Sequence, residues 1–208
     1  MLFVLGALIA LATVLTIVGK YRSPVQLYLF KPLTIGLIIL LAWRVGAHEP
    51  DRYFWLILAG LVFSAAGDVF LMLPRDRFVP GLLSFLVAHL LYITAFSAPA
   101  GFLAAPLLAL PYLAGAGILL LILLPKTGKL KLPVIVYAVA LATMGWQAAS
   151  RWQALQDMAS LYAMIGAILF LVSDSVLAIN RFAKPFRAAE ALLLTTYFAA
   201  QTLIALSL

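Results

Sequence analysis

The ionisable residues inside long apolar stretches are the part of this sequence that can do chemistry. Only Lys31, Asp68, His89 and Asp174 stand well inside such stretches, and Glu190 stands at the edge of the last one. A charged side chain at the centre of a membrane helix costs about 2.5–3.5 kcal/mol on insertion scales, and such residues usually serve a function. Two carboxyl groups and one ammonium group therefore predict acid–base chemistry at a buried site.

The unequal charge count predicts different states for the two carboxyl groups. Lys31 can hold one aspartate ionised, whereas the second aspartate has no counter-charge and burial favours its neutral form. Two carboxyl groups in different protonation states can act as an acid and a base. We therefore predict that Asp68 and Asp174 are the catalytic residues, each of them essential, with the assignment of acid and base left open.

Polar residues at helical spacing predict support for these carboxyl groups. His89 and Tyr92 are three residues apart, and Tyr197 and Gln201 are four apart, so each pair shares a helix face. Ser173 directly precedes one of the aspartates. We expect a set of supporting or substrate-binding residues around one pocket: Lys31, His89, Tyr92, Ser173, Tyr197 and Gln201.

Each of these residues also has a structural interpretation. Lys31 can extend toward the lipid headgroups, and the aspartates can be structural partners of that lysine or of backbone donors. His89 can be a neutral, satisfied donor between helices. Glu190 can do no more than favour the N-terminus of a helix.

Other chemistries fit the sequence less well. The chain has no cysteine, two distant histidines and no His-Glu-x-x-His motif, so we expect no metal site. It also lacks a Gly-x-Ser-x-Gly elbow and a phosphate-binding glycine loop. The net charge of +7 does not predict a nucleic-acid partner, because the basic residues lie in short loops between apolar segments.

Eight apolar helices must position these residues. The chain is 66% hydrophobic and 10% charged, whereas a soluble domain carries about 25% charged residues. Its continuous apolar runs have the length of about 20 residues that crosses a bilayer as a helix. We predict an all-α integral membrane protein, with one transmembrane domain over residues 1–208 and the first, fifth and sixth helices serving only as packing. The expected spans are 2–18, 25–43, 54–73, 79–97, 103–124, 131–149, 160–178 and 190–207.

The distribution of basic residues predicts the orientation. Loops after the first, third, fifth and seventh spans carry ten Lys and Arg residues, and loops on the other face carry three. Because basic loops stay in the cytoplasm, we expect both termini outside, in a plasma (bacterial inner) membrane. Lys31, Asp68 and Asp174 then lie at a similar depth, about 9–10 Å from the cytoplasmic ends of their helices.

A weak internal similarity suggests a duplication. Residues 63–73 read FSAAGDVFLML and residues 169–179 read LFLVSDSVLAI, each with an aspartate near the end of an apolar helix. An offset of four helices preserves orientation, so the pattern favours parallel repeats of four helices each, over residues 1–100 and 101–208. The alternative is chance similarity between apolar helices.

The order of the polar motifs resembles the YhhN-like lysoplasmalogenase family of multispan membrane enzymes over essentially the whole chain. The resemblance implies an ether hydrolase that cleaves the vinyl ether bond of lysoplasmalogens to a fatty aldehyde and a glycerophospho-alcohol. It also implies no metal or other cofactor, with a lysophospholipid substrate in the bilayer. The motifs that carry it are Lys31-Pro32, Gly67-Asp68, Ala88-His89 with Tyr92, Ser173-Asp174, and Tyr197 with Gln201.

The predicted residues suit this chemistry, because a vinyl ether resists base but is sensitive to acid. A protonated aspartate would be the general acid, and an ionised one would stabilise the resulting cation and activate water. Two other functions stay open. Paired aspartates in a membrane also occur in proton- or sodium-coupled transporters, and the same groups can hydrolyse another lipid.

Overall fold

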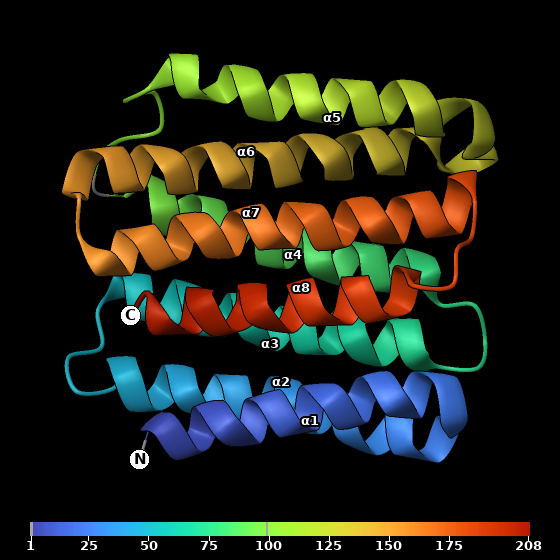
Figure 1. The fold of residues 1–208 in the computed structure, drawn as a ribbon. Coiled ribbons are helices and arrows are strands. Elements are labelled where there is room, and N and C mark those ends of the chain that lie inside the picture. The colour runs from blue at the N-terminus through green and yellow to red at the C-terminus, as the bar shows by residue number, and fades with distance from the viewer. Residues whose placement is uncertain (1, 99) are drawn as a thin grey trace.

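The computed structural model describes residues 2–98 and 100–208 as a bundle of long helices that lie side by side (Figure 1). Eight of its helices are long and apolar enough to cross a membrane, and the described residues contain no strand. The predicted fold, an all-α membrane protein with eight spans, is confirmed. The helices are α1 (Leu2–Arg22), α2 (Pro24–Gly46), α3 (Arg52–Met72), α4 (Phe78–Ser97), α5 (Ala109–Leu123), α6 (Lys131–Leu155), α7 (Met158–Ala178) and α8 (Ala189–Leu206).

Local capping explains where three of the helices begin. The Ser23 hydroxyl accepts from the backbone N–H of Gln26 at 3.4 Å, just before α2. The carboxylate of Asp51 caps α3 through Phe54 at 2.8 Å, and Asp157 caps α7 at 2.7 Å. Such caps satisfy backbone donors that the first turn leaves free. They place these helix starts one or two residues earlier than the apolar pattern predicted.

The fifth and sixth predicted spans differ most in length from the helices observed. The fifth begins with a 3-10 turn, η1 (Pro106–Leu108), and α5 itself starts only at Ala109. Proline costs little in a first helical turn but disrupts a helix interior, so the helical start lies close to Pro106 and Pro111 and not at residue 103. The sixth span continues to Leu155, because helical hydrogen bonding extends past the apolar run, and it ends where Gln156 turns left-handed with φ 54°.

The interior of the bundle lies around α4, α6 and α8. Helices α1 and α2, α3 and α4, and α7 and α8 pack as antiparallel neighbours, while α4 also contacts α6 and α8 contacts α2. Helix α5 lies at one edge of the bundle (Figure 1), and its only buried residues are Ala109 and Leu123. The predicted duplication of four helices stays a prediction.

One glycine has a direct bearing on the polar interior. A Cβ atom at Gly67 on α3 would lie 2.6 Å from the ring of Phe85 on α4. Real Cβ atoms do not approach this closely, so only glycine lets the aromatic ring lie against α3 here.

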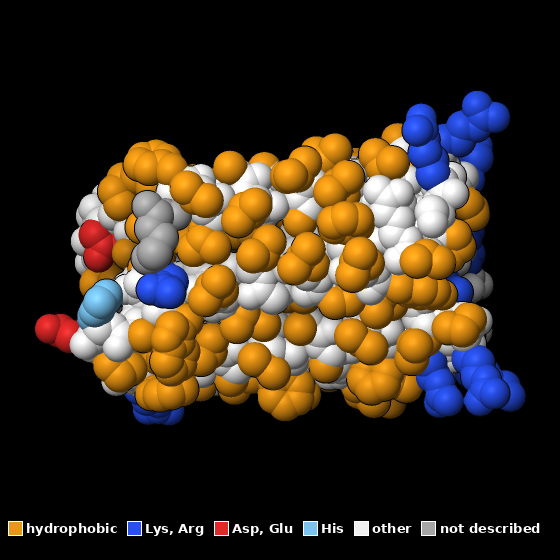
Figure 2. Space-filling model, turned by 90° about the horizontal axis from the view of Figure 1, so that it is seen from below, with side chains coloured by type: hydrophobic (Ala, Val, Ile, Leu, Met, Phe, Trp, Pro, Cys, Tyr) orange, Lys and Arg blue, Asp and Glu red, His pale blue; other side chains and the backbone are white. Residues whose placement is uncertain are grey.

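Charge is distributed unevenly along the bundle. Lys and Arg side chains gather mainly at one end of the face that Figure 2 shows, and hydrophobic side chains cover the length between the ends. This end holds the connections after α1, α3, α5 and α7, and both termini lie at the opposite end (Figure 1). The side of the membrane that the basic end faces stays a prediction.

Candidate active site

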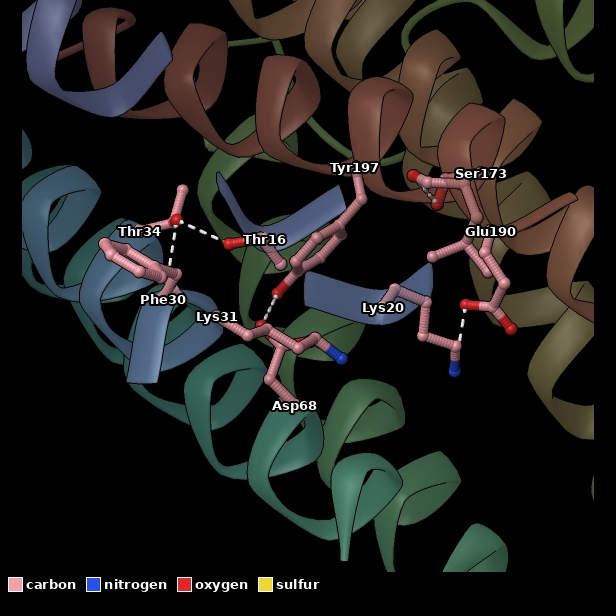
Figure 3. Close-up of polar contacts among 10 residues, drawn as sticks. Thr16, Lys20, Phe30, Lys31, Thr34, Asp68, Ser173, Glu190 and Tyr197 are labelled. Atoms are coloured by element: carbon pink, nitrogen blue, oxygen red, sulfur yellow. Dashed lines mark hydrogen bonds and ion pairs between the residues drawn. The ribbon is translucent and has the colours of Figure 1, made fainter. Parts of the chain in front are cut away.

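Lys31, Asp68 and Tyr197 form a buried polar cluster where α2, α3 and α8 meet (Figure 3). The ammonium nitrogen of Lys31 lies 3.0 Å from Asp68 Oδ1, and both residues are less than 10% exposed. The Tyr197 hydroxyl donates to Asp68 Oδ2 at 2.8 Å. Lys31 therefore pairs with a carboxylate instead of extending to the headgroups, as the charge count predicted for one of the two aspartates.

Two residues of α8, one helical turn apart, contact the neighbouring helices α3 and α4. Tyr197 and Gln201 lie one turn apart on the same face. Tyr197 reaches Asp68 on α3, and Gln201 accepts a hydrogen bond of 2.9 Å from the hydroxyl of Tyr92 on α4. All four groups are at most 3% exposed. The predicted residues on α4 and α8 thus join α3, α4 and α8 in the interior.

The second carboxyl group has different partners. Asp174 on α7 accepts a hydrogen bond from the hydroxyl of Tyr137 on α6. Its Oδ2 atom lies 3.8 Å from Nε2 of His89 on α4, beyond hydrogen-bond distance. No Lys or Arg within the described residues forms an ion pair with it. The two aspartates therefore differ in the way that the sequence predicted, one paired with a cation and the other not.

His89 is the most unusual group at this site. It is fully buried, and neither ring nitrogen has a hydrogen-bond partner among the residues that the structure describes. Its ring packs edge-on against Tyr137 and Phe170 at centroid distances of 5.0 and 4.9 Å. An unsatisfied buried polar group costs about 1–3 kcal/mol, and the described residues offer His89 no partner that would make it a satisfied donor between helices.

Aromatic rings connect the two clusters. Phe170 lies between His89 and Tyr197, with ring centroids 4.9 and 5.6 Å away, and Phe85 lies 5.8 Å from Tyr197. The predicted residues thus form two clusters on either side of these rings, and not the lining of one cavity.

Ser173 and Glu190 have structural contacts, and Tyr137 joins the site from α6. Ser173 donates to the carbonyl oxygen of Leu193 at 3.1 Å, which ties α7 to α8. Glu190 lies in the first turn of α8 and pairs with Lys20 at 3.3 Å (Figure 3). Tyr137 is not among the predicted site residues, because α6 was expected to serve only as packing, and its hydrogen bond to Asp174 shows that this expectation is wrong. A tyrosine in mid-span, away from the aromatic belt, was the available signal.

A polar cavity, here called the vestibule, opens at the basic end of the bundle and reaches Lys31. Its volume is about 590 Å³. At its rim Arg181 donates to Asp76 at 2.6 Å, joining the α3–α4 loop to η4 (Ile179–Ala183), a π-helical turn after α7. This guanidinium holds the pKa of Asp76 below its usual range. The vestibule gives water and polar groups a route to the Lys31–Asp68 pair.

An apolar crevice reaches the other carboxyl group. This crevice lies between α4, α5, α6 and α7, and Tyr137 and Asp174 are among the residues that line it. A wider groove of about 280 Å³ between α5, α6 and α7 shares Leu119, Ala138 and Leu141 with it. Ile168 and Val172 on the wall of this groove are exposed on the surface of the bundle. Asp174 is therefore next to a path for hydrocarbon.

Comparison with known proteins identifies the family. The model of the YhhN family matches residues 26–208. The chain belongs to the YhhN family. The membrane protein YhhN of Escherichia coli O157:H7 is 32% identical over 96% of each chain. No solved structure matches the chain.

Two further relatives of the chain are named as enzymes. Lysoplasmalogenase TMEM86B of Homo sapiens is 41% identical over 82% of this chain and 71% of its own length. Lysoplasmalogenase TMEM86A of Bos taurus is 40% identical over 82% of this chain and 72% of its own. The resemblance drawn from the polar motifs is confirmed, and these relatives support a lysoplasmalogenase-like role.

Proposed function

We propose that this protein is a membrane-embedded ether hydrolase that cleaves the vinyl ether bond of lysoplasmalogens. The observation that carries the proposal is the unequal pair of buried carboxyl groups, one beside a cation and one beside an apolar crevice. Relatives named as lysoplasmalogenases, at 40 and 41% identity, supply the substrate class. Acid-sensitive ether cleavage needs one carboxyl group in each protonation state.

In the proposed mechanism Asp174 is the general acid. It has no cationic partner within the described residues, and the narrow crevice beside it adjoins the groove of about 280 Å³ that takes the hydrocarbon chain in this mechanism. Tyr137 fixes the orientation of the carboxyl group through its hydrogen bond. His89, 3.8 Å away and unpaired, is placed to exchange a proton with Asp174 when the groups move together.

Asp68 is the ionised partner. Lys31 and Tyr197 both hold its negative charge, and the vestibule that reaches Lys31 supplies water. A carboxylate fixed in this way stabilises a developing cation and accepts a proton from attacking water. The rings of Phe85 and Phe170 between the clusters present further favourable surface to a cation.

The reaction balances with water as the only co-reactant. Asp174 transfers a proton to the vinyl carbon β to the ether oxygen, and the α-carbon and oxygen share the resulting positive charge. Water adds to the α-carbon as Asp68 accepts its proton, which gives a hemiacetal. Collapse of the hemiacetal breaks the bond between the α-carbon and the ether oxygen, as Asp68 returns its proton to the leaving oxygen and Asp174 regains a proton from the hemiacetal hydroxyl. The products are a fatty aldehyde and a glycerophospho-alcohol.

The alternative functions differ in whether an aldehyde is released and in whether an ion gradient is required. A proton- or sodium-coupled transporter also uses buried aspartates, but it releases no aldehyde and requires a gradient. A hydrolase of another lipid leaves the vinyl ether intact. The crevice beside Asp174 favours a lipid substrate over a small polar solute.

The experiment is aldehyde release by purified protein in detergent supplied with a lysoplasmalogen. Asp68→Asn and Asp174→Asn keep side-chain volume but remove acid–base capacity, and each is expected to lower turnover by about 10²-fold or more. Asp157→Asn is the matched control, since asparagine caps a helix as well as aspartate does. Near-normal aldehyde release by either folded site variant would exclude that residue as a catalyst.

A further inference from the structure

The vestibule carries more positive charge than the protein itself neutralises. Three of its cations have carboxylate partners, because Lys20 pairs with Glu190, Arg181 with Asp76, and Lys31 with Asp68 at 3.3, 2.6 and 3.0 Å. The basic residues that line it are Lys20, Lys31, Arg75, Arg77 and Arg181, and its acidic residues are Asp76 and Glu190.

Arg75 and Arg77 are the two cations that have no such partner. Neither forms an ion pair within residues 2–98 and 100–208, and both lie in the α3–α4 loop at the mouth of the cavity. Arginine presents a planar fork of donors that matches the oxygens of phosphate. Both arginines are exposed, so the vestibule offers two unpaired guanidinium groups to an anion of this shape.

The vestibule also adjoins the apolar crevice. Phe78 and Leu177 line both cavities, so they form the boundary between a polar and an apolar space. The Arg181 guanidinium lies over the Phe78 ring at 5.0 Å, on the polar side of this boundary. A molecule with an anionic head and a hydrocarbon chain can occupy both spaces and cross at this boundary, close to the two buried carboxyl groups.

We infer that the vestibule binds the headgroup phosphate of the substrate and that Arg75 and Arg77 are its ligands. The inference rests on the proposed function and deepens it. In a lysoplasmalogen the glycerol unit alone separates the phosphate from the vinyl ether oxygen. A phosphate held at the mouth of the vestibule directs the glycerol inward to Lys31 and Asp68, and the alkenyl chain into the crevice beside Asp174.

The first experiment measures selectivity for phosphate. The kcat/KM for a 1-alkenyl glycerophosphoethanolamine is compared with that for a 1-alkenylglycerol, which lacks the phosphate, in wild type and in Arg75→Gln/Arg77→Gln. We expect the double replacement to reduce the preference for the phosphorylated substrate by about 10- to 100-fold, the effect of losing charge-assisted hydrogen bonds. The preference of Arg22→Gln, a variant of an exposed arginine at the same end that does not line the vestibule, stays at the wild-type value.

The second experiment separates this inference from the proposed function. A saturated 1-alkyl glycerophosphoethanolamine has the same headgroup and no vinyl ether, so its binding needs no catalysis. We expect its Kd to rise by about 10- to 100-fold in the double variant but not in Arg22→Gln. If wild type released no aldehyde yet showed this pattern, the proposed function would fail and the phosphate site would stand.

Two results would overturn the inference. One is a phosphate preference and an analogue Kd that are the same in wild type and in the double variant. The other is displacement of the analogue by inorganic phosphate as effectively as by the lysophospholipid, which would assign the vestibule to free phosphate. We expect inorganic phosphate to compete only weakly, because the hydrocarbon chain contributes to lipid binding through the crevice.

Discussion

Lys31 is the only lysine or arginine within ion-pair distance of either buried aspartate in the described part of the chain. Its pairing with Asp68 supplies the counter-charge that a buried carboxylate needs, since an isolated ion in the protein interior is strongly unfavourable. The contact distinguishes Asp68 chemically from Asp174, whose hydrogen bond comes from a neutral phenol. In the proposed mechanism Lys31 thereby determines that Asp68 is the ionised group and Asp174 the general acid.

A double-mutant cycle tests this pairing. Lys31→Met leaves Asp68 without its counter-charge, which is expected to destabilise the protein by about 3–5 kcal/mol and to lower aldehyde release. Lys31→Met/Asp68→Asn removes both charges, so it is expected to unfold at a higher temperature in detergent than Lys31→Met alone. Additive effects of the two single replacements on unfolding would refute the pairing.

The exposed pair of Lys20 and Glu190 is the matched control for this cycle. Their side chains are 38% and 29% exposed and lie 3.3 Å apart. Partly exposed ion pairs contribute at most about 1 kcal/mol. The cycle of Lys20→Met and Glu190→Gln should therefore show a coupling energy several times smaller than that of the buried pair.

The sequence could predict the charged members of the site but not their partners. Asp68, Asp174 and Lys31 are recognisable because an ionisable residue in an apolar span is costly and therefore conspicuous. Tyr137 gives only a weak signal as a tyrosine away from the aromatic belt, and it is the rotation of α6 about its axis that brings it to Asp174. Likewise, the unsatisfied nitrogens of His89 depend on what surrounds them, and the sequence alone does not fix these surroundings.

Helix α5 is the element least integrated into the bundle. It packs mainly on α6, and only two of its residues are buried. The apolar crevice and the groove both lie along its inner side, and the crevice reaches Asp174. The apolar pattern predicted a span here but assigned it only a packing role. In the proposed function α5 forms the outer wall of the path that takes the hydrocarbon chain.

Filling the groove should change the chain length that the enzyme prefers. Gly115 on α5 lines the groove, and a Cβ atom there would meet no atom within 4 Å. We expect Gly115→Leu to lower kcat/KM for long alkenyl chains by about fourfold for each methylene displaced, because burying a methylene is worth about 0.8 kcal/mol. Short chains should be affected least.

Gly117 provides the control for this experiment. A Cβ atom there also meets nothing within 4 Å, but the residue does not line the groove. Gly117→Leu should therefore keep the wild-type dependence of kcat/KM on chain length. An identical shift in both variants would show that α5 tolerates bulk poorly in general and that the groove does not hold the chain.

At the scale of the whole molecule, the basic end and the candidate site lie together. The vestibule opens among the Lys and Arg side chains of this end and leads to Lys31. The number of spans and their order were predictable, because the bilayer thickness fixes helix length and short loops fix antiparallel neighbours. The way the helices pack is not contained in such patterns, so the two cavities could not be predicted.

Orientation can be tested directly because the chain contains no cysteine. Single replacements Glu49→Cys in the α2–α3 loop and Lys184→Cys before α8 place one thiol at each end of the bundle. Since basic loops stay in the cytoplasm, a membrane-impermeant thiol reagent should label Glu49→Cys in intact cells and Lys184→Cys only after permeabilisation. The reverse pattern would place the vestibule on the outer side.

The vestibule and the groove open onto different solvents, the vestibule onto water at the basic end and the groove onto lipid beside α5. Substrate that arrives through the groove is drawn from a two-dimensional solution, so its effective concentration is its mole fraction in the bilayer. Diluting the substrate with inert lipid or detergent should then slow turnover even at a constant bulk amount. In the proposed reaction the products also separate by phase, with the aldehyde returning to the bilayer and the glycerophospho-alcohol leaving into water. Their partition into different phases opposes recombination at the site.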